Sequence, residues 1–174
     1  MMLARFPRIA IKRNIDPKRI MSLTVTTQWE LPNSPHTPKT TIPCLGFGVY
    51  KAAGHSPILT ALKQGYRQLD TAQLYGNEEE VGHVVTTCGL PRSELFIVTK
   101  IGDPKGGVDE TLECLRDCVR ESSGSKGKWE GGEGYVDLFL IHNPLSGPEG
   151  RKMLWQALEK LRAEGGTREI GVSN

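Results

Sequence analysis

Apolar runs alternate with amphipathic segments along most of this chain, and that alternation limits the folds that it can adopt. Five runs are predicted to be strands, and the four segments between them to be helices, because their apolar residues recur three or four positions apart. The predicted strands are 44–51, 66–70, 95–100, 135–144 and 169–174, and the predicted helices are 55–64, 78–87, 108–121 and 149–164. Such alternation favours an α/β fold, a parallel sheet whose strands are joined by crossover helices.

Both an (α/β)8 barrel and an open doubly wound sheet satisfy this pattern. A Gly-x-Gly-x-x-Gly run between the first strand and its helix would favour the open sheet, of Rossmann or flavodoxin type. Here Gly46 and Gly48 lie inside the first predicted strand, and no third glycine begins the next helix. The pattern therefore favours a partial TIM barrel over residues 44–174, in which polar residues at the strand ends build a site.

Two segments precede the predicted barrel. Residues 21–43 are predicted to form a β-hairpin from strands 23–29 and 40–43, because alternating β-branched residues lead into a proline-rich loop. Residues 1–20 are basic and poor in acids. Two interpretations of them stay open, a mitochondrial targeting segment and an upstream extension with Met21 as the natural start.

Composition argues against several classes of function. The 174 residues are 37% hydrophobic and carry a net charge of +2, so a nucleic-acid or anionic-membrane partner is not predicted. No apolar run approaches the ~20 residues of a membrane span. A polar, glycine-rich stretch, 122–134, is predicted to be a surface loop.

Cysteine usage argues against a metal site. The four cysteines form no Cys-x-x-Cys pair and no His/Cys cluster with zinc spacing. Cys114 and Cys118 share one face of a predicted helix, and we expect them to be a buried pair of free thiols. Free thiols are typical of a reducing compartment, so we expect a cytoplasmic protein, with mitochondrial import as the alternative.

Four polar residues lie where predicted strands end. Asp70 and Tyr75 follow the second strand, Lys100 ends the third, and His142 lies near the end of the fourth. A buried lysine needs a partner, and Asp70 is the nearest; a purely structural ion pair is the alternative interpretation. An ammonium group stabilises a phenolate, so a tyrosine beside it can protonate a developing alkoxide. A histidine can orient the carbonyl oxygen, and the set therefore predicts a site that polarises and protonates a C=O group.

From about Pro43 to Asn174, the chain resembles the N-terminal half of an aldo-keto reductase. The matching segments are LGFGVYK (45–51), GYRQLDTAQLYGNEEEVG (65–82), ELFIVTK (94–100), YVDLFLIHNP (135–144) and EIGVSN (169–174). The resemblance implies an (α/β)8 barrel with an N-terminal hairpin. It also implies reduction of a small-molecule aldehyde or ketone with NADPH, without a metal ion.

The resemblance assigns a role to each of these residues. Tyr75 would be the general acid, Lys100 would be paired with Asp70 and stabilise the phenolate, and His142 would orient the carbonyl. The residues implied to bind the cofactor are Lys51, Asp70, Ser173 and Asn174. Those implied to contact the substrate are Tyr50, Leu74, His142 and Asn143.

Residues 44–174 would supply about half of a barrel that typically takes ~250 residues. The last three strands and helices would be absent, which would leave strand edges unpaired. We therefore expect the chain alone to fold poorly or self-associate, and to bind NADPH weakly. Two hypotheses about function stay open, a carbonyl reductase and a truncated, non-catalytic relative or binding subunit.

Overall fold

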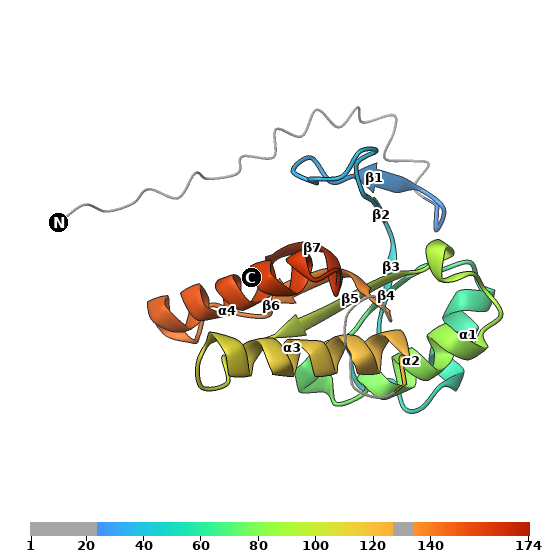
Figure 1. Ribbon diagram of the computed structural model, residues 1–174. Coiled ribbons are helices and arrows are strands. Elements are labelled where there is room, and N and C mark those ends of the chain that lie inside the picture. The colour runs from blue at the N-terminus through green and yellow to red at the C-terminus, as the bar shows by residue number, and fades with distance from the viewer. Residues whose placement is uncertain (1–23, 127–133) are drawn as a thin grey trace.

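The computed structural model describes residues 24–126 and 134–174, and the basic segment 1–20 lies outside them. Within the described residues a parallel sheet has the order β3-β4-β5-β6-β7, and β1 pairs with β2 in an antiparallel hairpin (Figure 1). The strands are β1 (Gln28–Glu30), β2 (Thr41–Pro43), β3 (Gly46–Gly48), β4 (Gln68–Asp70), β5 (Phe96–Ile101), β6 (Val136–Ile141) and β7 (Thr167–Val172). The predicted hairpin and parallel sheet are therefore confirmed.

The helices all pack on one side of this sheet. They are α1 (Ser56–Lys63), α2 (Glu78–Thr87), α3 (Val108–Ser123) and α4 (Gly147–Ala163), with the short 3-10 helices η2 (Gln73–Tyr75) and η3 (Arg92–Glu94). Each α-helix contacts the next one in the chain, so the helices lie side by side along the sheet (Figure 1). The strand order also follows the chain without reversal. A doubly wound sheet would divide its helices between two faces, so both observations favour the barrel arrangement.

The core lies between the sheet and the helices. Strand β5 is buried along its whole length. Its residues Ile97 and Ile101 join the apolar core, while Thr99 between them reaches Glu78 of α2. Because side chains alternate across a strand, Lys100 points to the opposite, inner face of the sheet. No helix in the described part of the chain is long and apolar enough to span a membrane.

The hairpin begins later than the sequence predicts. Strand 23–29 was expected, but β1 starts at Gln28, and the preceding residues form a turn closed by Thr27 N–H donating to Thr24 O at 3.0 Å. The hydroxyl groups of Thr24 and Thr26 also bond to each other, at 2.8 Å. Threonine side chains that bond locally compete with strand pairing, which explains the shorter strand.

Two further boundaries differ from the prediction. Strand 44–51 shortens to Gly46–Gly48, and its predicted last residue, Lys51, has a φ of 59°, which is incompatible with an extended strand. Helix α3 continues to Ser123, two residues into the segment predicted to be a loop; part of that loop, 127–133, lies outside the described residues.

Polar groups lock the amino-terminal end of the sheet. Arg92 Nη2 donates to Asp137 Oδ2 at 2.7 Å, and the Ile97 N–H donates to the same oxygen at 2.9 Å. Ser34 of the hairpin loop donates its hydroxyl hydrogen to Glu169 of β7 at 2.5 Å. The first two contacts fasten β5 to β6, and the third fastens the hairpin to β7.

Candidate active site at the carboxyl ends of the strands

The four residues predicted to carry chemistry lie at the carboxyl-terminal end of the sheet. Asp70 is the last residue of β4, Lys100 is the next-to-last residue of β5, and His142 directly follows β6. Tyr75 ends η2, which follows β4 after a two-residue connection. Since β4, β5 and β6 are parallel neighbours, their carboxyl ends bring these side chains together.

Lys100 is held by two acceptors. Its Nζ donates to Asp70 Oδ1 at 2.5 Å and to the Thr71 carbonyl oxygen at 2.9 Å. The Lys100 side chain is 7% exposed, whereas that of Asp70 is 31% exposed. The ion pair predicted between them is therefore present, and its carboxylate is partly exposed to solvent.

The Tyr75 ring lies against the other members of the set. Its centroid is 5.7 Å from that of His142, in an edge-to-face arrangement, and 4.9 Å from that of Tyr50. Lys100 Nζ lies 5.1 Å from the Tyr75 centroid. The phenol is thus surrounded by an ammonium group, an imidazole and a second aromatic ring.

His142 is shifted toward its neutral form. Burial lowers its pKa below the ordinary value of 6.5, the positive charge of Lys100 lowers it further, and Asp70 opposes both effects. The imidazole is therefore uncharged at neutral pH. A neutral imidazole has one N–H group, so it can donate a hydrogen bond to a carbonyl oxygen without transferring its proton.

The predicted substrate residues Tyr50 and Leu74 project from the rim, with exposed fractions of 61% and 78%. The side chain of Asn143 bends back, since its Oδ1 accepts the Leu145 N–H at 2.9 Å. Leu145 itself is 83% exposed, and sequence reasoning missed it as a rim residue. The signal available in the sequence was an apolar residue, Leu145, directly after the predicted strand and Pro144.

Lys51, Ser173 and Asn174 were predicted to bind the cofactor. Lys51 is exposed and its Nζ lies 5.2 Å from the Tyr50 centroid. Asn174 Nδ2 donates to the His142 carbonyl oxygen at 2.9 Å and lies 3.3 Å from Ser173 Oγ, so the two residues are tied to the end of β6. A hydroxyl and an amide can bond both the oxygen and the nitrogen of a carboxamide, so their chemistry fits a nicotinamide.

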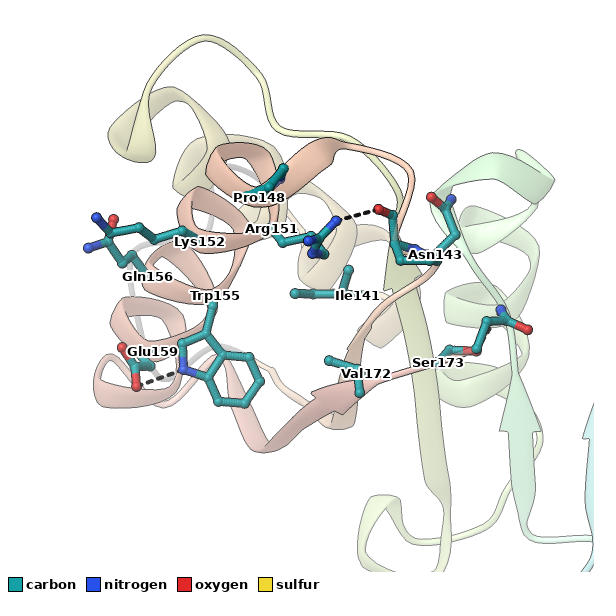
Figure 2. A pocket seen from close by; sticks show the side chains of 12 residues that line it. Ile141, Asn143, Pro148, Arg151, Lys152, Trp155, Gln156, Glu159, Val172 and Ser173 are labelled. Carbon is teal, nitrogen blue, oxygen red and sulfur yellow. Dashed lines mark hydrogen bonds between the residues drawn. The ribbon is translucent and has the colours of Figure 1, made fainter. Parts of the chain in front are cut away.

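A pocket of about 740 Å³ lies between β7 and α4 (Figure 2). Its wall includes Asn143, Ser173 and Asn174, with Trp155 and Arg151 on the helix side. Tyr75 and Lys100 do not line this pocket. Lys100 and His142 therefore lie close to Tyr75, and Ser173 and Asn174, the residues predicted to bind the carboxamide, line a separate pocket.

Asn77 supports the rim in a way that the sequence did not predict. It is the N-cap residue of α2, but its side chain makes no cap hydrogen bond. Instead its Nδ2 donates to the Val49 carbonyl oxygen at 2.8 Å and its Oδ1 accepts the Thr71 hydroxyl at 2.9 Å. The buried amide thus ties the end of β3 to the end of β4 and fixes the start of the Tyr75 turn.

Glu78, the first residue of α2, is a second unpredicted feature. Its Oε1 accepts hydrogen bonds from the hydroxyls of Thr99 and, at 3.1 Å, Ser122. Burial raises the pKa of Glu78 to about 7, although these hydrogen bonds oppose the shift. In the described residues no group of three or more His, Cys, Asp or Glu side chains is arranged to hold a metal ion.

Comparison of the sequence with known proteins identifies its relatives. The model of the aldo/keto reductase family matches residues 51–174. A glyoxal reductase of Bacillus subtilis (strain 168) is 39% identical over 137 residues, which make up 76% of this chain and 46% of that protein. The chain spans about half the length of the curated relatives it matches.

Solved structures agree. The crystal structure of an aldo/keto reductase from Brucella melitensis is similar with a TM-score of 0.72 and 34% identity, over 85% of this chain and 54% of that one. A Bombyx mori aldo-keto reductase in complex with NADP gives a TM-score of 0.64 and 26% identity, over 84% of this chain and 50% of that one. The predicted barrel class is thereby confirmed.

Proposed function

Because the chain belongs to the aldo/keto reductase family, we propose that it takes part in reducing a small aldehyde or ketone to an alcohol with NADPH. The observation that carries the proposal is that the Tyr75 ring lies close to both His142 and Lys100, which is paired with Asp70. The name of the Bacillus subtilis relative favours a small oxoaldehyde such as glyoxal as the substrate.

In this proposal Tyr75 donates the proton to the carbonyl oxygen. Lys100 stabilises the negative charge that develops on the phenol, and Asp70 with the Thr71 carbonyl holds the ammonium group in place. Neutral His142 donates a hydrogen bond to the carbonyl oxygen and so orients it toward Tyr75. Tyr50 and Leu74, exposed on the rim, provide apolar surface for the substrate, and Asn143 lies beside His142.

We assign the carboxamide of the cofactor to Ser173 and Asn174, and an outer contact to Lys51, with Asp70 nearby on the rim. NADPH supplies the hydride when it is bound. The support is the chemistry of the hydroxyl and amide groups, their place beside the pocket, and the NADP complex of the Bombyx mori relative.

The test compares oxidation of NADPH by glyoxal, followed by absorbance, in the unchanged chain and in Tyr75→Phe. Loss of the general acid should lower kcat by about 100-fold or more. Tyr66→Phe is the matched control, because Tyr66 packs edge-on against Phe47 at 6.2 Å, away from the proposed site, and should leave the rate unchanged. Equal rates in Tyr75→Phe and the unchanged chain would remove the acid role from Tyr75.

A non-catalytic relative is the second candidate, and one observation favours it: the pocket that Ser173 and Asn174 line includes neither Tyr75 nor Lys100. In that case the unchanged chain would oxidise no NADPH with glyoxal at any substrate concentration. Quenching of NADPH fluorescence then distinguishes a binding subunit, which would still quench, from a chain that does not bind the cofactor.

We also propose that the chain self-associates. In residues 24–126 and 134–174, β3 pairs only with β4 and β7 pairs only with β6, so each outer strand has an open edge. Val172 on β7 is also exposed. Open strand edges pair readily with other strands, and analytical ultracentrifugation should show dimers or larger species.

The four free cysteines suit a cytoplasmic location, which cell fractionation would test.

A further inference from the structure

Two turns of the chain meet at the rim of the candidate active site, and each carries one tyrosine. The first turn, 49–52, contains Tyr50 and is closed by a backbone N–H that donates to the Val49 carbonyl oxygen at 2.9 Å. The second turn, 71–77, follows β4 and contains Tyr75. The centroids of the two tyrosine rings are 4.9 Å apart. The separation of the rings therefore depends on how the two turns are held relative to each other.

The side chain of Asn77 joins these turns. Its Nδ2 donates to the Val49 carbonyl oxygen at 2.8 Å, the same oxygen that closes the first turn. Its Oδ1 accepts the Thr71 hydroxyl at 2.9 Å, which links the last residue of the second turn to its first. Asn77 is 8% exposed and Thr71 is completely buried, so water does not compete for these bonds. One buried amide thus holds both turns.

Thr71 extends this connection to the ammonium group of the site. Its N–H donates to the Val98 carbonyl oxygen at 2.9 Å, its hydroxyl donates to Asn77, and its own carbonyl oxygen accepts Lys100 Nζ at 2.9 Å. Loss of the Asn77 contact would leave the Thr71 hydroxyl buried without its acceptor, which is unfavourable. A shift of Thr71 that relieves this would move the carbonyl group that holds Lys100.

The two partners of Asn77 require an amide at this position. A carbonyl oxygen can only accept, so the atom that faces Val49 must be a donor, while the atom that faces the Thr71 hydroxyl acts as its acceptor. An aspartate has the same shape, but when ionised it has no donor. Asp at position 77 would keep the bond from Thr71 and place a carboxylate oxygen against the Val49 carbonyl oxygen.

We propose that Asn77 is a positioning residue for the reduction proposed above, and this inference rests on that function. It holds Tyr75 at a fixed distance from Tyr50 and, through Thr71, from Lys100. Displacement of the proton donor by about 1 Å can lower a rate about 100-fold. A shift of Tyr75 and Lys100 should therefore lower kcat, and a shift of Tyr50, on the substrate side, should raise KM.

The test measures kcat and KM for oxidation of NADPH by glyoxal in Asn77→Asp. At pH 8 the carboxylate repels the Val49 carbonyl oxygen, and kcat should be about 10- to 100-fold lower than in the unchanged chain, with KM also raised. Burial raises the pKa of such a carboxyl, and near pH 5.5 its protonated form can donate as the amide does, so kcat should largely recover. Rates are compared with the unchanged chain at each pH, because both chains contain His142 and Glu78, which also titrate.

Two further variants sharpen the test. Thr71→Val removes the hydroxyl at every pH but keeps the carbonyl group that holds Lys100, so its kcat should be low at pH 8 and should not recover at pH 5.5. Asn33→Asp is the matched control, because it makes the same change at an exposed position in the hairpin loop, and its rate should equal that of the unchanged chain. Circular dichroism at the assay temperature gives the fraction of each variant that is folded.

An unchanged kcat for Asn77→Asp at pH 8 would overturn the proposal. A fall in kcat that only follows the loss of folded chain would also overturn it, and so would a fall that persists at pH 5.5.

Hydrogen exchange of peptides that cover 49–52 and 71–77 needs no reductase activity. At pH 8 both turns should exchange faster in Asn77→Asp than in the unchanged chain, and neither should in Asn33→Asp. Unchanged exchange in the two turns would contradict the proposal. An unchanged chain that reduces no glyoxal would remove the proposed function, and hydrogen exchange would still decide whether Asn77 holds the two turns.

Discussion

Each end of the sheet holds an ion pair between a basic residue and an aspartate, and the two pairs differ in what surrounds them. At the amino end, the Asp137 side chain is 2% exposed and is bonded by Arg92 and the Ile97 N–H, with Arg168 at 3.5 Å. At the carboxyl end, the side chain of Asp70 is one-third exposed, and a phenol and an imidazole lie beside its partner Lys100. The first pair is enclosed and joins structural elements, whereas the second is partly exposed and lies beside titratable groups.

The comparison teaches that a buried ion pair alone does not identify a functional site. Burial raises the pKa of Asp137 even though two guanidinium groups oppose the shift, which shows how completely that carboxyl is removed from water. The groups that bond to Asp137 only hold the fold together. At the other end, Lys100 lies beside the titratable side chains of Asp70 and Tyr75, and Asp70 is partly exposed to solvent. This difference can be tested by replacing the basic residue of each ion pair in turn.

Arg92→Met should have the largest effect on stability. It leaves the Asp137 carboxylate buried with a weaker partner, and we expect a loss of about 3–5 kcal/mol in the free energy of unfolding. Urea denaturation at pH 7 measures it. The loss should shrink at pH 5, where Asp137 can take up a proton.

Arg168→Met is the matched control, because Arg168 is half-exposed and more distant from Asp137. It should cost less than 1 kcal/mol, as exposed pairs do. Equal losses of stability in Arg92→Met and Arg168→Met would contradict the conclusion that Arg92 is the main partner of the buried Asp137.

Glu78→Gln should change the pH dependence of stability at the carboxyl end. Because the pKa of Glu78 rises from 4.5 to about 7 on folding, the folded chain holds a proton that the unfolded chain releases. The stabilisation that comes from binding this proton is fully present below pH 4.5 and is lost as the pH rises through 7. Its size is about 3 kcal/mol. Gln keeps the uncharged form, so the variant should gain this much over the unchanged chain at pH 8.

The measurement is urea denaturation at several pH values, with Glu79→Gln as the control, since Glu79 is exposed. His142 contributes with the opposite sign, because its pKa falls on folding, and it is present in all three chains. Identical pH profiles for Glu78→Gln and the unchanged chain would show that the carboxyl is not held in its neutral form.

Ser34→Ala should loosen the hairpin from the amino end. The Ser34 hydroxyl donates to the buried Glu169 carboxylate, and a hydrogen bond to a charged group contributes about 2 kcal/mol. Thermal unfolding followed by circular dichroism should show this loss, whereas the exposed Ser93→Ala should show none. If the bond between Ser34 and Glu169 adds nothing to stability, the melting curves of Ser34→Ala and Ser93→Ala will superimpose.

Lys100→Met should have only a small effect on stability, about 1 kcal/mol, because water can reach the Asp70 carboxylate that it leaves behind. Under the proposed function the same change should abolish measurable reduction of glyoxal. Pairing this result with Arg92→Met separates the two ends of the sheet: one variant loses stability, and the other loses chemistry.

Much of this arrangement could be predicted from the sequence. The alternation of strands and helices gave the parallel sheet, and parallel neighbours bring Asp70, Lys100 and His142 to one rim. The role of Asn77 could not be predicted, because an asparagine before a helix is typical of a cap, whereas its side chain bonds to Val49 and Thr71, which the folded chain brings near.

The buried acids were missed for a related reason. In the sequence, Glu78 is one of three glutamates in a helix's first turn, and nothing local distinguishes it from its exposed neighbour Glu79. Asp137 lies within an apolar strand, and its partner Arg92 precedes a different strand, 45 residues away. Local patterns predict which residues lie on a strand or helix, but not which carboxylates will be enclosed by others.

The order of the sheet has a consequence for how the chain folds. Each strand of the parallel sheet pairs with the strand next to it in sequence, so each strand can join the sheet as soon as it has been made. The bond between Ser34 and Glu169 is different, because it joins residues 135 positions apart. The hairpin is made before the sheet, but it can dock onto β7 only after all five strands of the sheet have been made.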